Sequence, residues 1–145
     1  MNKKSTFSII FLTVILVSVV YFVFFQTAEK QIKKTVSEYW TLMEKGEFNQ
    51  SVKLFHDGES YSGGLHMYFY KLQKHYKYLN EEKKFKENII VKDTTYIGQK
   101  MKYVQYYIKD KKQKKPPLII TFIFWKENGY DNIYSTKFEN LLEWY

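Results

Sequence analysis

Leu118-Ile-Ile-Thr-Phe-Ile-Phe-Trp125 is the stretch that decides the fold of this chain. It carries no charge and is apolar on both of the faces that alternate along a strand, which is typical of a strand at the centre of a sheet. Asn128-Gly129 follows it closely, and this dipeptide favours a two-residue hairpin turn. The stretch therefore predicts a central strand at 118–126 that turns back into another strand at 130–138.

Two further segments upstream are rich in Ile, Val, Tyr and Thr, residues that are enriched in strands. They lie at 86–96 and 101–110, with Gly98 between them, and the lysine-rich stretch Lys111–Pro117 joins the second to the central strand. The sequence thus predicts four consecutive antiparallel strands.

The residues before these strands follow the 3.6-residue period of helices. Apolar positions three or four apart predict helices at 28–45, 47–56 and 62–80. Gly46 and the pair Asp57-Gly58 are expected to end the first two helices. Because helices come first and strands follow, the predicted fold class is α+β, with three helices packed on one face of a curved four-stranded antiparallel sheet.

The run from Phe7 to Phe25 precedes all of these elements and has 19 uncharged residues. As a helix it would measure about 28 Å, close to the hydrocarbon thickness of a bilayer. Lys3 and Lys4 before it also suit a signal peptide, but the run is longer than a usual signal core and no Ala-x-Ala pattern follows it. We therefore predict a membrane anchor or uncleaved signal at 1–27 and one folded domain at 28–145, exported across a bacterial cytoplasmic membrane.

The charge of the chain comes from lysine alone. Its formal net charge is +8, with 23 basic residues that are all lysine and with no cysteine. Lysine attracts acidic surfaces but lacks the forked guanidinium by which arginine reads phosphates and bases. The expected partners are the membrane, a protein partner or a second copy, and a small hydrophobic ligand; no nucleic acid, metal or cofactor is expected.

Two segments resemble a known superfamily. Val36–Phe55 resembles the opening helices of nuclear transport factor 2-like domains, and Phe124–Ile133 (Phe-Trp-Lys-Glu-Asn-Gly-Tyr-Asp-Asn-Ile) resembles their last hairpin, with Tyr130 where that family favours Trp. The resemblance covers residues 28–138. It implies a cone in which a curved sheet wraps a long helix, with a pocket at the wide end.

Enzymes of that superfamily use a buried Asp or His with Tyr hydroxyls inside the cone. The resemblance therefore implies ligand-pocket candidates on the predicted first helix and the strands: Trp40, Asp93, Tyr106, Trp125 and Tyr134. The neighbours His56 and Asp57 look like a base and its orienter, but adjacent side chains at a helix end are expected to diverge. No nucleophile elbow, phosphate loop or carboxylate pair appears in the sequence.

The segment Lys109–Lys115 holds five lysines and one aspartate. We expect Lys111, Lys112, Lys114 and Lys115 to contact anionic lipid headgroups or an acidic partner; the alternative is a solvated hairpin tip whose charges discourage edge pairing. Trp144 and Tyr145 are expected either to fold back onto the domain or to form an exposed handle.

These observations favour a membrane-tethered, non-enzymatic binding domain. A structural subunit of an envelope or secretion assembly is one alternative. A small pocket enzyme of the isomerase or hydrolase type, with Asp93 and Tyr106 or Tyr134 as its acid–base set, is another.

Overall fold

The computed structural model describes the backbone of residues 3–112 and 114–144, and the side chains of residues 11–23, 28–112 and 114–144. The chain divides into two compact units, Met1–Lys30 and Gln31–Tyr145. Each is described by itself below, and the second is called the folded unit.

The first unit is helical. Helix α1 (Lys3–Lys45) supplies it, and this helix is long and apolar enough to cross a membrane. The described side chains of residues 11–23 are all exposed, as expected for an apolar surface that lipid rather than protein would cover. Length and composition thus support the expected membrane segment.

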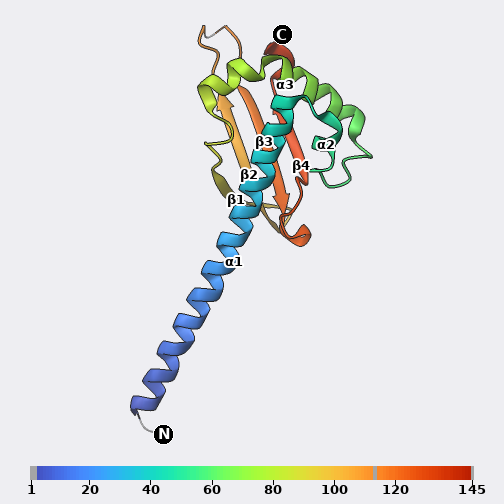
Figure 1. Cartoon of the computed structure of the whole chain (residues 1–145). Coiled ribbons are helices and arrows are strands. Elements are labelled where there is room, and N and C mark those ends of the chain that lie inside the picture. The colour runs from blue at the N-terminus through green and yellow to red at the C-terminus, as the bar shows by residue number, and fades with distance from the viewer. Residues whose placement is uncertain (1–2, 113, 145) are drawn as a thin grey trace. The chain divides into compact units, whose positions relative to one another are not determined.

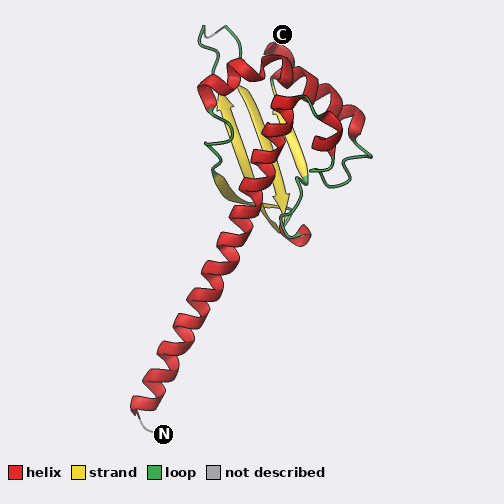
Figure 2. Cartoon of the chain, in the orientation of Figure 1, coloured by secondary structure: helices red, strands yellow, loops and turns green. Residues whose placement is uncertain are grey.

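The folded unit contains the four antiparallel strands that the sequence predicts, in the order β1-β2-β3-β4. Figures 1 and 2 show this sheet with helices on one of its faces. The strands are β1 (Val91–Tyr96), β2 (Gln99–Ile108), β3 (Leu118–Trp125) and β4 (Ser135–Glu139). The α+β class and the sheet are therefore confirmed, with β3 between two partners as its two-sided apolar pattern requires.

Three helical segments belong to the folded unit. They are the part of α1 from Gln31 onward, α2 (Phe48–Val52) and α3 (Ser62–Lys83), and the short 3-10 helices η1 (Lys126–Asn128) and η2 (Leu141–Trp144) flank β4. The predicted first helix at 28–45 is not a separate element, because α1 has no break between the apolar run and Lys45. The sequence has no Pro or Gly there that would end a helix.

The inner faces predicted from periodicity are the ones that the structure buries. On α1 the buried positions lie three or four apart, and the same spacing recurs on α3. These residues form one core with alternate residues of β2 and β3. The helical members are Ile32, Val36, Tyr39, Trp40, Met43, Phe69, Leu72, Tyr76 and Leu79.

The glycine after α1 ends that helix, as predicted. Gly46 has φ of +75°, in the left-handed region that glycine adopts without a steric penalty. A Cβ there would lie 2.5 Å from the side-chain nitrogen of Gln73 on α3. Gly46 thus both stops α1 and lets α3 approach closely.

Three local predictions were wrong. The predicted strand at 86–96 begins only at Val91, because the residues directly after α3 form a turn at 85–87. The second helix is shorter than 47–56, because α2 ends at Val52 and turns follow. Asn128-Gly129 does not form a two-residue hairpin, since β4 begins only at Ser135, opposite Ile123. The residues between leave the sheet: Ile133 donates its N–H to the Leu54 carbonyl at 2.8 Å and accepts from the His56 N–H at 2.9 Å. Pairing with the segment after α2 outweighs the turn propensity of the dipeptide.

The folded unit has two ends, which we name by their contacts. At the proximal end, the Thr35 hydroxyl donates to the Asp131 carbonyl at 3.2 Å, so this is where α1 enters the unit. The β1–β2 turn at Ile97-Gly98 lies at the same end, because Met101 pairs with Trp125 there. The distal end carries the β2–β3 connection, which Figure 1 shows at the other extremity of the sheet.

Candidate functional site

Trp40 and Tyr106, two of the expected pocket residues, meet inside the core. The Trp40 indole N–H donates to the Tyr106 hydroxyl oxygen at 3.2 Å, and that hydroxyl donates to the Phe85 carbonyl at 2.8 Å. Trp40 also stacks on the Phe85 ring with centroids 4.1 Å apart. Burial raises the pKa of Tyr106. Both polar groups are satisfied internally, so the pair is a structural element of the core.

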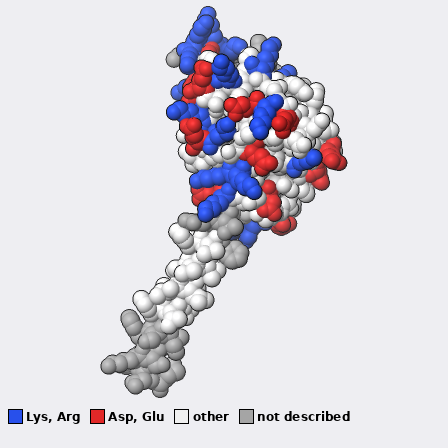
Figure 3. Space-filling view, in the orientation of Figure 1, with Lys and Arg blue, Asp and Glu red and all other residues white. Residues whose placement is uncertain are grey.

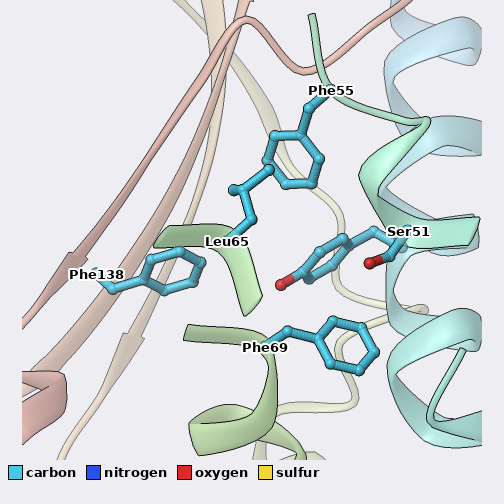
Figure 4. Close-up of a pocket in the computed structure, with 6 residues that line it drawn as sticks. Ser51, Phe55, Leu65, Phe69 and Phe138 are labelled. Carbon is cyan, nitrogen blue, oxygen red and sulfur yellow. The ribbon is translucent and has the colours of Figure 1, made fainter. Parts of the chain in front are cut away.

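Neighbouring core residues surround a small apolar pocket. Figure 4 shows its lining, contributed by α1, α2, α3, β4 and the segment after α2. The lining residues are Tyr39, Ser51, Phe55, Leu65, Phe69 and Phe138. The pocket has no space for a water-sized sphere, and burial raises the pKa of Tyr39. A small hydrophobic ligand would have to displace these rings to enter.

Asp93, the expected acid, pairs with a lysine. Its Oδ1 lies 2.6 Å from Lys102 Nζ, where Lys102 is nearly fully buried and Asp93 is exposed. The Lys102 ammonium also lies 5.9 Å from the ring centroid of Tyr130, a weak cation–π contact. Burial, the largest cause, raises the pKa of Tyr130, while Lys102 opposes that shift. Asp93 therefore serves to neutralise a buried lysine.

The proposed acid–base set is not assembled around Tyr106. Asp93 is opposite Lys102 in the β1–β2 register, and Tyr106 is four residues further along β2. Four residues of a strand span about 13 Å. Proton transfer between these two groups would need direct hydrogen-bond reach.

Trp125 and Tyr134 do come together, on the partly exposed surface. Their ring centroids are 5.0 Å apart, and the His56 ring lies 5.8 Å from Tyr134. His56 Nε2 is 3.3 Å from Asp57 Oδ2, so the expectation that these neighbours diverge was wrong. Asp57 has φ of +52°, in the left-handed region. Both side chains are well exposed, and neither lines the apolar pocket of Figure 4.

The lysine-rich loop at the distal end, Lys109–Lys115, is the most strongly charged feature of the folded unit. Figure 3 shows blue side chains gathered at this end of the molecule. Lys111, Lys112, Lys114 and Lys115 are all exposed. Asp110 organises the loop: its carboxylate accepts the backbone N–H groups of Lys112 at 3.2 Å and Lys114 at 3.0 Å. These bonds, that of Lys112 first, lower the pKa of Asp110.

The base of this loop is fastened to the rest of the unit. The Trp144 indole N–H donates to the Pro116 carbonyl at 2.8 Å, and the Asn140 side-chain amide donates to the Pro117 carbonyl at 2.8 Å. Trp144 thus folds back onto the domain, whereas Tyr145 lies outside the described residues. The Lys111 ammonium lies 5.5 Å from the Tyr78 ring centroid on α3. The lysines are therefore presented from a supported loop.

The pKa of His75, on α3, is affected by the positive charge at this end. Burial, followed by the charges of Lys74 and Lys115, lowers the pKa of His75 on α3. Lys74 and Lys115 come from different elements, so the positive charge extends from the loop onto α3.

The chain was compared with known protein families, proteins and structures. No family model, curated protein or solved structure matches the chain. Among the described residues, no three His, Asp or Glu side chains are grouped so that they could hold a metal ion.

Proposed function

We propose that this chain is a membrane-tethered, non-enzymatic interaction domain that binds an acidic partner through the lysine-rich loop Lys109–Lys115. In this proposal the apolar run of α1 is a single-pass anchor in a bacterial cytoplasmic membrane, and the folded unit is exported. A helix of sufficient length and hydropathy supports the anchor.

The observation that carries the proposal is the position of the loop. It projects from the distal end, whereas α1 enters the folded unit at the proximal end. Exposed lysines at the end of the folded unit opposite Thr35 are accessible to a partner that approaches from solvent. Point charges without arginine forks suit a surface of dispersed carboxylates, and such charge complementarity acts mainly on the rate of association.

The fold supports a finer proposal, that the folded unit is of the nuclear transport factor 2-like type. Support comes from the order of helices before four antiparallel strands and from a helix whose inner face packs on the sheet. The interior of the folded unit is filled by Trp40, Phe85, Tyr106 and their neighbours, which favours a role at the surface over one in a pocket.

In-cell photo-crosslinking tests the proposed partner site. A photoreactive residue at Tyr107, which is 48% exposed and close to Lys109, would be placed in the full chain and in a variant with Lys111, Lys112, Lys114 and Lys115 changed to Gln. We expect the yield of the cross-linked product to fall on the order of tenfold in the variant, because the steering charge is lost.

A matched control variant loses the same four positive charges at other positions. It changes the exposed residues Lys45, Lys53, Lys92 and Lys137 to Gln and should leave the yield near that of the parent. Equal yields from parent and loop variant, or equal losses in both variants, would contradict the proposal.

A further inference from the structure

The β1–β2 turn combines two features that folding alone does not favour. Ile97 has φ of +49° and Gly98 has φ of +73°, the pair of positive angles of a type I′ turn. Asn, Asp or Gly normally occupies the first position, and a β-branched residue there is a steric outlier. The Ile97 side chain is also 82% exposed, so no burial offsets the strain.

The neighbouring residue extends the exposed apolar surface. Tyr96 is 62% exposed, and its ring packs against no other aromatic ring of the described residues. Strained backbone and exposed apolar side chains concentrate at binding sites. The Tyr96–Ile97 tip therefore points to an apolar partner.

The position of the tip identifies that partner. It lies at the proximal end of the folded unit, the end at which Thr35 bonds to Asp131. Only ten residues of sequence separate Thr35 from Phe25, the end of the apolar run. The apolar run is thus close in sequence to the end of the folded unit that carries the tip.

The chemistry of the tip and its surroundings suits the same partner. Tyrosine is enriched at the headgroup level of membranes, where its ring is apolar and its hydroxyl is hydrated. Two exposed lysines lie on the β2–β3 side of the tip: Lys100 follows it on β2, and Lys126 begins the connection after β3, next to Trp125, the partner of Met101. Lysines near an anionic surface add electrostatic attraction.

We propose that the Tyr96–Ile97 tip inserts into the headgroup–acyl boundary of the bilayer that the anchor crosses. In this proposal the proximal end makes a second contact with lipid. This inference rests on the proposed tether but not on the proposed acidic partner.

Site-directed fluorescence tests the inference on the full chain. The protein has no cysteine, so a single Ile97→Cys substitution can be labelled with an environment-sensitive probe. The labelled chain is reconstituted in vesicles of phosphatidylcholine and phosphatidylglycerol, with or without a phospholipid that carries a quencher in its acyl chain. We expect blue-shifted emission and strong quenching at position 97, and the same at Tyr96→Cys.

Two matched positions make the outcomes distinct. Leu142→Cys is the control, because Leu142 is an equally apolar residue, 64% exposed, on η2 at the distal end; it should not be quenched. Val17→Cys reports the anchor and should be quenched. Quenching at Val17 without quenching at 96 and 97 would overturn the inference and leave the tether intact.

The remaining results are equally decisive. A blue shift at position 97 without lipid quenching would indicate a protein contact and overturn the inference. Equal quenching at 97 and 142 would do the same, because it would show probe-driven adsorption. No quenching at Val17 would overturn the proposed tether, and the inference with it.

Discussion

Two buried tyrosines of the same core differ in what their hydroxyl groups do. The Tyr106 hydroxyl accepts from the Trp40 indole and donates to the Phe85 carbonyl. The Tyr76 hydroxyl is buried and has no hydrogen-bond partner among the described residues. An unsatisfied buried polar group costs free energy, whereas a satisfied one contributes modestly. The Tyr106 hydroxyl thus contributes hydrogen bonds to the core, and the Tyr76 hydroxyl does not.

This difference predicts opposite effects of the same substitution. Tyr106→Phe should lower the free energy of unfolding by about 1–3 kcal/mol, because it leaves the Trp40 N–H and the Phe85 carbonyl buried without a partner. Tyr76→Phe should be neutral or slightly stabilising and is the control. Denaturant unfolding of the full chain in mild detergent measures both. Equal changes in the two variants would contradict the different roles assigned to the two hydroxyl groups.

At the residue scale, the sequence predicted which residues are buried in the core better than it predicted which residues line a pocket. The helical period correctly placed Trp40 on a buried face, whereas Tyr106 was expected only as a pocket residue implied by the family resemblance. Whether such residues line a pocket or fill it depends on Phe85, which stacks on Trp40 from the segment after α3. That contact joins residues 45 positions apart, and no local pattern encodes it.

The turns show what local signals at the scale of elements can and cannot predict. Gly98 separates β1 from β2 as its conformational freedom suggests. Asn128-Gly129 carries an even stronger turn signal, yet the chain leaves the sheet there because Ile133 pairs with the segment after α2. A tertiary hydrogen bond overrides turn propensity in the second case. The unusual Ile before Gly98 was the sequence signal for the proximal tip, and turn chemistry would have revealed it.

The β1–β2 hairpin should become more stable when Ile97 at its turn is replaced. Ile97→Asn replaces a strained β-branched residue with one that tolerates the left-handed region. Because Ile97 is 82% exposed, little apolar burial is lost. We expect the free energy of unfolding to rise by about 1 kcal/mol, as measured by chemical denaturation in detergent.

A substitution within the adjacent strand is the control for this gain. Thr95→Asn, at an exposed position of β1, should be neutral or slightly destabilising, since Asn is disfavoured in strands. A stability gain at Thr95 equal to that at Ile97 would argue against strain at the turn.

At the scale of the whole molecule, the two ends of the folded unit differ in the surface that they expose. The proximal end carries the exposed tip and receives α1, and the distal end carries the lysine loop with its fastenings at Pro116 and Pro117. Charge composition alone left three alternatives for these lysines: lipid headgroups, an acidic partner or a solvated hairpin tip. Their position opposite the entering helix favours a partner in solvent, and this position depends on the strand register, which the sequence did not specify.

The buried phenols predict how the whole folded unit responds to alkaline pH. Burial raises the pKa of Tyr39 and Tyr106, and raises that of Tyr76 to about 12, with nearby Glu44 as a smaller cause. In the unfolded chain tyrosine titrates near pH 10. Above that pH the unfolded state therefore binds fewer protons than the folded state, so the stability that is fully present below about pH 10 is lost progressively as pH rises toward about 12.

Denaturant midpoints across this range measure the effect, with tyrosinate absorbance recorded in parallel. The midpoint should be nearly constant up to about pH 9 and then fall, and the buried tyrosines should ionise only as the unit unfolds. Tyr76→Phe removes one of the shifted groups, so its decline should be shallower than that of the parent. A parent midpoint that stays level between about pH 10 and 12 would mean that these phenols reach solvent in the folded state, and the filled interior that favours a surface role would have to be abandoned.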